Sequence, residues 1–351
     1  DVPVKVLQIM MSDVDKHVIA FGCNPIGSSV LDPLLVRFSD RESAVDWTPT
    51  ATNQAGGVQL STGSIIIGAL RTRQEILIWT DAGIVSMRFV GEPFIFSFTE
   101  VAEGPSLIAP NAAVSANNRV YFMDRDGFHV YSGSTQRLPC TVLDYVLSDL
   151  NQDQAFKVFA AANEGVNEVM FFYPSGTNTE IDKYVLYNYL EGTWSIGTTA
   201  DNFVRTSWDE ASVYENPLAA SKNDSTNINY IYRHEIGHGD GSDNFTAFIE
   251  SSDFDLNPDG EKFTFISKLI PDVEFRDQQS TADTVTFTIK GRDYPLQDLS
   301  TLQTINVTPQ STFENTRARS RQAAVRISSD ASDYGWRIGD IRLDIRPDGK
   351  R

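Results

Sequence analysis

Short β-hairpins that close on a glycine recur along the first 245 residues. Residues 76–90 have the pattern of a strand, an Asp-Ala-Gly turn and a second strand, and residues 119–133 follow the same plan. Residues 184–197 repeat it around a Glu-Gly pair. Two runs rich in β-branched and aromatic residues on either side of a turn glycine are typical of a β-hairpin. The pattern therefore restricts this region to an all-β fold built from repeated hairpins.

The spacing of the hairpins is typical of a β-propeller. The turn glycines Gly83 and Gly127 stand one blade period apart, about 40–50 residues. The next interval is longer and contains residues 141–159, where apolar residues recur at helical spacing. We therefore predict a β-propeller over residues 1–245 with one short helical insertion near 141–159.

Residues 246–351 have a different sequence pattern, with longer runs of alternating apolar and polar residues. In 341–346, two isoleucines and a leucine alternate with two arginines and an aspartate. Such alternation indicates an antiparallel sheet with one face in water. We predict a small antiparallel β-sandwich over 246–351.

The charge of the chain is strongly acidic and unevenly distributed. Its 351 residues carry a formal net charge of -18, yet residues 317–351 hold nine Lys or Arg against five Asp. The other residues hold 20 basic and 42 acidic side chains. A generic nucleic-acid binder needs the opposite sign, because its contacts are made with phosphates. A basic tail on an acidic body instead indicates self-assembly or docking.

Neither the apolar runs nor the cysteines indicate a membrane protein or a cysteine enzyme. The longest apolar runs are far too short to span a bilayer. Cys23 and Cys140 fit two interpretations, buried small apolar residues or a single disulfide.

Residues 234–238, His-Glu-Ile-Gly-His, match the H-E-x-x-H pattern of zinc metalloproteases. That pattern needs a helix, which places both imidazoles on one face. Three of the five residues from 237 to 241 are glycine, each costing about 1 kcal/mol in a helix interior. The position of a third ligand is Asn244 rather than histidine. We therefore predict a strand that ends in a glycine-rich turn, with His234 and His238 solvated and no zinc site.

Other catalytic and metal-binding patterns are incomplete. Residues 253–263 are similar to an EF-hand loop, but Pro258 stands at position six and Thr264 at position twelve. No G-x-S-x-G, P-loop or G-x-G-x-x-G motif is present. Paired carboxylates for glycoside hydrolysis cannot be selected among 47 acidic residues. We predict a protein that is not an enzyme, with no catalytic residues, metal site or cofactor.

The arginines Arg317, Arg319 and Arg321 stand at period two, so on a strand they project from one face. Three interpretations remain open. The face is a wet sheet surface with local ion pairs, a subunit interface that docks on acidic neighbours, or a phosphate-binding surface for nucleic acid. We name the three arginines as the candidate subunit interface.

Several longer stretches resemble a family of bacteriophage tail proteins. They include "PLLVRFSDRESAVDWTPT", "GEPFIFSFTEVAEG", "LPCTVLDYVLSDLNQDQAFKVFA", "YNYLEGTWSIG", "FTAFIESSDFDL" and "YGWRIGDIRLDIRPDGKR". The chain is similar to the tail tube, nozzle or packaged-DNA stabilisation proteins of short-tailed phages. The resemblance implies a β-propeller with a sandwich appendage, arranged as a homo-oligomeric ring around the DNA channel. Members have more sequence before the equivalent of residues 17–22, so we expect the first blade to be incomplete.

The resemblance also implies a function and a location. We expect a structural ring protein of the virion, six copies in the phage tail, that retains packaged DNA and passes it at ejection. Its partners would be an adaptor protein above and tip or fibre proteins below, and DNA would pass without specific binding. An acidic channel would repel the duplex and keep it mobile. The alternative is a host-receptor or glycan-binding propeller at the tail tip.

Overall fold

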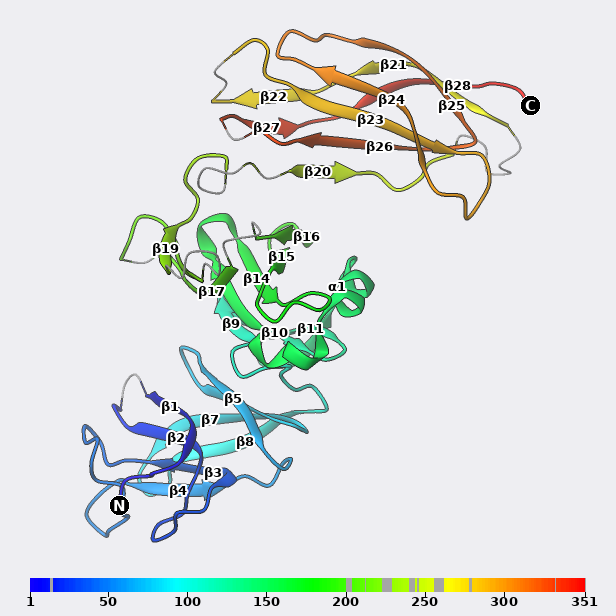
Figure 1. Cartoon of the computed structure of the whole chain (residues 1–351). Coiled ribbons are helices and arrows are strands. Elements are labelled where there is room, and N and C mark those ends of the chain that lie inside the picture. Colours follow the sequence, from blue (N-terminus) through cyan, green and yellow to red (C-terminus); the bar gives the residue numbers. More distant parts are fainter. Residues whose placement is uncertain are drawn as a thin grey trace. The chain divides into compact units, whose positions relative to one another are not determined.

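The chain folds into two compact units, Asp1–Glu235 and Ile236–Arg351 (Figure 1). The computed structural model describes residues 1–12, 15–199, 204–211, 213–222, 229–239, 244, 246–255, 262–277, 280–331 and 333–350. The boundary between the units in the sequence falls between residues 235 and 236, rather than after residue 245 as predicted. Over the described residues, no helix is long and apolar enough to cross a membrane.

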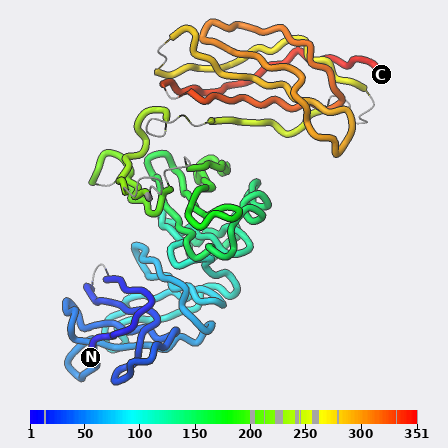
Figure 2. The backbone as a smooth tube through the Cα atoms, viewed as in Figure 1, coloured from blue at the N-terminus to red at the C-terminus, as the bar shows by residue number. Residues whose placement is uncertain are grey.

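Five antiparallel sheets follow one another along the first unit, and each takes its strands in chain order. Figure 2 traces the backbone in colours that follow the sequence. The first is β1 (Val6–Met11), β2 (Val18–Cys23), β3 (Asp32–Phe38) and β4 (Gly56–Gln59), and the second is β5 (Ile66–Arg71), β6 (Ile76–Thr80), β7 (Gly83–Gly91) and β8 (Ile95–Glu103). The third is β9 (Ala113–Ala116), β10 (Arg119–Asp124), β11 (Gly127–Tyr131) and β12 (Thr135–Leu138). The fourth is β13 (Phe159–Asn163), β14 (Glu168–Tyr173), β15 (Lys183–Asn188) and β16 (Thr193–Thr198). The fifth, within the described residues, is β17 (Val204–Asp209), β18 (Leu218–Lys222) and β19 (Tyr230–Arg233).

The first strands of neighbouring sheets are joined by specific contacts. The side-chain amide of Gln8 on β1 donates to the carbonyl of Ala69 on β5 and accepts from its backbone N–H, at 2.8 and 2.7 Å. Asn111 forms a parallel β-bridge with Phe159 at the start of β13. The indole of Trp208 on β17 donates to the carbonyl of Ala162, 3.0 Å away. Successive four-stranded meanders joined through their first strands are the blades of a β-propeller, and the predicted fold class is confirmed.

Two expectations about the blades need correction. The first sheet has four strands, as have the next three, because residues 6–11 form β1 ahead of the predicted strand at 17–22. The hairpins at 76–90 and 119–133 are the second and third strands of their blades, but 184–197 is the third and fourth strand of its blade. In that blade a long loop over 174–182 separates the second and third strands, so the tight glycine turn marks the next hairpin instead.

The predicted helical insertion is present between the third and fourth blades. It consists of α1 (Leu143–Asp149) and a 3-10 helix, η1 (Gln152–Lys157). Val146 of α1 is fully buried against an apolar cluster that contains Phe128 of the third blade and Phe171 of the fourth. The helix therefore closes the core between these two blades. A second 3-10 turn, η2 (Glu164–Val166), links β13 to β14.

The second unit is an antiparallel β-sandwich, as predicted. One sheet has the order β20 (Ala247–Glu250), β26 (Gln322–Ser329), β23 (Val285–Arg292) and β24 (Ser300–Val307). The other has the order β25 (Glu314–Ser320), β21 (Thr264–Ile270) and β28 (Arg342–Pro347), and β22 (Val273–Arg276) pairs with β27 (Gly335–Ile338). The inner faces share one core, to which Phe287 and Val325 contribute from the first sheet and Ile266 from the second. The apolar residues of 341–346 pack on this core and their polar neighbours face outward.

Candidate functional site

All five blades contribute to one cavity of about 310 Å³. Each blade supplies residues from its first strand, and the lining comprises Gln8, Ala69, Leu70, Trp79, Leu107, Pro110, Asn111, Ala113, Phe159, Ala160, Thr206, Ser207 and Trp208. Gly68 permits the close approach of two blades here, since a Cβ at this position would lie 2.6 Å from the carbonyl oxygen of Pro110. The cavity therefore lies where the inner strands converge, the position in which propellers form their central channel.

The cavity lining combines aromatic rings with neutral polar groups. Trp79 is fully buried and meets Phe122 edge to face, with ring centroids 5.5 Å apart. Its indole nitrogen has no hydrogen-bond partner among the described residues. The lining residues that the structure describes carry no charged side chain. Such a surface suits a neutral ligand that offers apolar faces and hydroxyl groups.

The three arginines of the candidate interface lie on and just beyond β25, but they do not act alike. Arg319 lies 3.8 Å from the ring centroid of Phe263, and its Nε donates to the carboxylate of Asp348 over 2.7 Å. Arg321 lies over the same ring at 4.8 Å. Arg317, two residues before Arg319 on β25, has an exposed side chain. The structure therefore brings Arg319 and Arg321 together on one aromatic ring and leaves Arg317 in water.

The arginine surface extends to β28, at the other edge of the same sheet. Phe265 of β21 is paired with Arg319 on one side and with Arg346 on the other. Arg346 lies 4.9 Å from the Phe265 ring, and Arg342 is exposed on the same face. We call this surface, formed by the outward side chains of β25, β21 and β28, the arginine face. The alternation in 341–346 indicates its second half, but no feature of the sequence shows that β25 and β28 flank the same strand, β21.

The H-E-x-x-H residues do not lie on a helix, since β19 ends at Arg233 immediately before them. His234 is half-buried rather than solvated: its ring lies 4.6 Å from that of Trp208, and its Nε2 accepts from Arg205. His238 is also half-buried and belongs to the second unit, where its Nε2 lies 3.2 Å from a carboxylate oxygen of Asp277. The prediction of two solvated histidines is therefore wrong, because each ring packs against partners distant in sequence. Gly241, and residues 256–261 of the EF-hand-like loop, lie outside the described residues.

Both cysteines are free, so the disulfide interpretation is excluded. Cys23 is fully buried on β2, and burial raises the pKa of its thiol to about 11. Cys140 is half-buried, and burial also raises its pKa. Both thiols are therefore protonated at neutral pH and behave as small apolar side chains.

Comparison with known proteins finds distant structural similarity only. No protein-family model and no curated protein matches the chain. The N-terminal domain of Nup159 is similar over 74% of this chain and 70% of its own, with a TM-score of 0.36 and 11% identity. A glycoside hydrolase is similar over 96% of this chain and 96% of its own, with a TM-score of 0.29 and 8% identity. An exo-β-1,3-galactanase from Phanerochaete chrysosporium, solved with galactose, covers 96% of this chain and 95% of its own, with a TM-score of 0.28 and 9% identity.

These neighbours correct one expectation from the sequence. Glycoside hydrolases are among them, which contradicts the prediction that the chain is not an enzyme, and we withdraw that prediction. Its basis was the lack of short catalytic motifs. Carboxylates for glycoside hydrolysis are brought together by the fold from separate parts of a chain, so a motif search cannot exclude them.

Proposed function

We propose that this chain is a subunit of a ring in the tail of a short-tailed bacteriophage, where it forms part of the DNA conduit. The arginine face is the observation that carries this proposal. Three of its arginines, Arg317, Arg342 and Arg346, are exposed on a protein whose net charge is -18. An exposed basic surface on an acidic chain is complementary to the rest of the same molecule. Head-to-tail contacts between copies, repeated around an axis, generate a closed ring.

The first unit supplies the acidic partner surface in this proposal. Residues 1–235 contain 28 Asp or Glu against 15 Lys or Arg.

A ring that presents acidic side chains to its channel would repel the phosphates of the duplex within about one Debye length, about 8 Å at physiological salt. DNA would then be retained and passed without tight contacts. The sequence resemblance to tail tube and nozzle proteins supports six copies, with other tail proteins above and below.

Charge reversal on the arginine face is expected to prevent ring assembly. The variant Arg317→Glu/Arg342→Glu changes two exposed side chains of the face and leaves the buried core of the sandwich intact. The matched control, Arg276→Glu/Arg337→Glu, makes the same change in charge on the exposed side of β22 and β27. Sedimentation velocity should show wild type and control as rings at about 50 mM salt, with dissociation at about 500 mM, and the arginine-face variant as a monomer. Equal assembly of the two variants, or a monomeric wild type, would contradict the proposal.

The cavity favours a second candidate function, a propeller at the tail tip that binds a neutral glycan. Aromatic rings next to amide and hydroxyl groups suit the apolar faces and hydroxyls of a sugar. If so, Thr206→Trp should fill the cavity and abolish binding on a glycan array, because Thr206 lines it with an exposed side chain. Thr193→Trp, at an exposed position of β16, is the control and should bind as wild type does. Undiminished binding by Thr206→Trp would exclude the cavity as the glycan site.

A further inference from the structure

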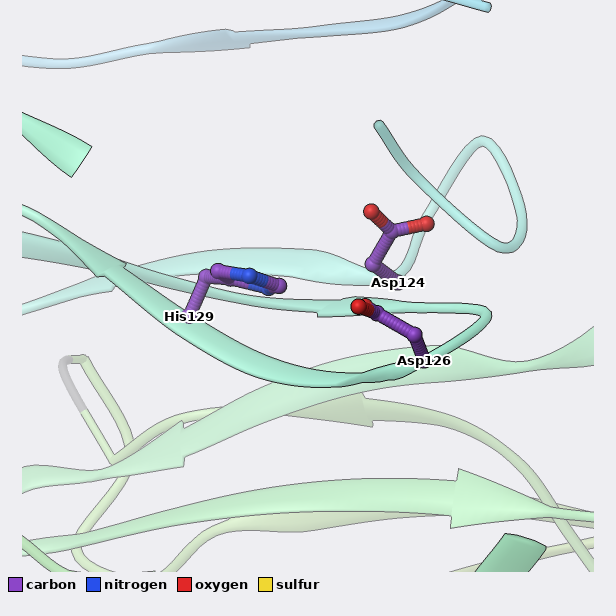
Figure 3. A group of neighbouring side chains, drawn as sticks. All are labelled: Asp124, Asp126 and His129. Carbon is purple, nitrogen blue, oxygen red and sulfur yellow. The ribbon is translucent and has the colours of Figure 1, made fainter. Parts of the chain in front are cut away.

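The turn between β10 and β11 brings two aspartates and a histidine together (Figure 3). Asp124 ends β10, Asp126 lies in the turn, and His129 is on β11. The turn is tight because Gly127, at a φ of 151°, pairs directly with Asp124. Phe122 pairs with His129, so the imidazole and the Asp124 carboxylate project from the same face of the hairpin.

The histidine is buried and lacks a partner. His129 is only 7% exposed, and its Nδ1 has no hydrogen-bond partner among the described residues. Its ring stacks on that of Phe122 with centroids 5.2 Å apart and planes at 17°, which fixes the plane of the imidazole. Figure 3 shows the edge of the ring directed toward the two carboxylates. A buried polar atom without a partner is unfavourable and calls for a bound group that would satisfy it.

The two carboxylates are available to such a group. Asp124 is fixed by the backbone N–H groups of Ser106 and Arg125, which donate to different oxygens at 2.9 and 2.6 Å. Each of these oxygens keeps a second lone pair. Asp126 is exposed and forms an ion pair with Arg137 at 3.7 Å, in which both side chains are more than half exposed. Exposed pairs of this kind are weak, so Arg137 does not prevent Asp126 from binding a cation.

The ligand atoms have a spacing that one ion can bridge. One ligand atom from each of the three residues lies within 4.8 Å of the other two. Bonds of about 2.0–2.2 Å to nitrogen and oxygen place the ligands of one ion about 3–4 Å apart, which small side-chain rotations would reach here.

We propose that Asp124, Asp126 and His129 bind a divalent transition-metal ion, with water completing its coordination. The nitrogen ligand favours zinc, nickel or a similar ion over calcium, which takes oxygen ligands and needs six to eight of them. The site lies wholly in the first unit and shares no residue with the H-E-x-x-H segment. It would link the third blade to the second, because Ser106, which donates to Asp124, also donates through its hydroxyl to the carbonyl of Thr80 on β6.

Isothermal titration calorimetry of the full chain with zinc chloride tests this proposal. Wild type is expected to bind one equivalent. Asp126→Asn alters an exposed residue and should weaken that binding by at least about 10-fold. His129→Phe keeps a ring to stack on Phe122 but removes both nitrogens, and it should abolish binding. His238→Asn, which removes a histidine of the H-E-x-x-H segment, is the matched control and should bind as wild type does.

Two results would overturn the proposal. One is the absence of saturable zinc binding by wild type. The other is binding that survives Asp126→Asn but is lost in His238→Asn, which would place the ion at the H-E-x-x-H segment. Circular dichroism establishes whether His129→Phe is folded, and if it is not, Asp126→Asn decides. Calcium, titrated in parallel, should give a much weaker signal, and equal binding of calcium would exclude the nitrogen ligand.

Discussion

Replacing Glu168 with glutamine is expected to stabilise the protein by about 2 kcal/mol at pH 8 and to have little effect at pH 4. Glu168 begins β14 in a half-buried position. Burial, followed by repulsion from Glu235 and Glu191, raises its pKa to about 7. The unfolded chain has the ordinary value of about 4.3. The folded state therefore holds this proton more tightly, and ionisation of Glu168 disfavours folding above pH 7.

The sign of the effect follows from linkage. The destabilisation of the folded state by the ionised Glu168 side chain is complete above pH 7. It declines as the pH falls toward about 4.3 and is absent below that value. Urea unfolding of wild type and Glu168→Gln should give midpoints that differ most at pH 8, less at pH 6, and very little at pH 4. Glu103→Gln, an exposed acid on β8, is the control and should track wild type at each pH. A difference between Glu168→Gln and wild type that does not change with pH would show that charge is not the cause.

Replacing Phe287 with alanine is expected to cost about 3–5 kcal/mol and to unfold the second unit selectively. Phe287 is fully buried in the sandwich core, and it lies on β23, which pairs with both β24 and β26. A loss of this size is a large part of the total stability of a domain. Thr288→Ala changes the next residue, whose side chain lies on the opposite face, and should cost much less.

Hydrogen exchange on the full chain measures this effect unit by unit. In Phe287→Ala, amides of β23 and β26 should lose protection. Amides of β6, whose strand is wholly buried in the first unit, should keep it. Equal loss of protection in both units would show that they unfold together and would contradict the expectation.

Local patterns in the sequence predicted individual strands and the helical insertion better than the order of the strands within a blade. The alternation in 341–346 was sufficient for β28, and the helical spacing in 141–159 for the insertion. The place of the 184–197 hairpin within the fourth blade could not be predicted. Gly192 marks the tightest hairpin of that blade, and a turn glycine does not show which two strands it joins. The loop over 174–182 gives no local sign that a blade continues across it.

The candidate sites depend on contacts that sequence spacing does not encode. The period of Arg317, Arg319 and Arg321 predicts a shared direction, but not the Phe263 ring on which only two of them pack. The raised pKa of Glu168 depends first on burial and then on Glu235, which lies far along the chain. Asp124, Asp126 and His129 could have been found, since they occur within six residues. Gly127, which lies between Asp126 and His129, led to the interpretation of a turn alone.

The order of strands within the sheets has a consequence for how the protein is made. In the first unit every sheet pairs neighbouring strands of the chain, so each blade can form its hydrogen bonds soon after its own residues leave the ribosome. In the second unit β20 pairs with β26, and β21 pairs with β28 at the far end of the chain. The sandwich therefore cannot be completed until β28 has been synthesised, and a chain terminated before residue 342 would carry finished blades but lack the β28 half of the arginine face.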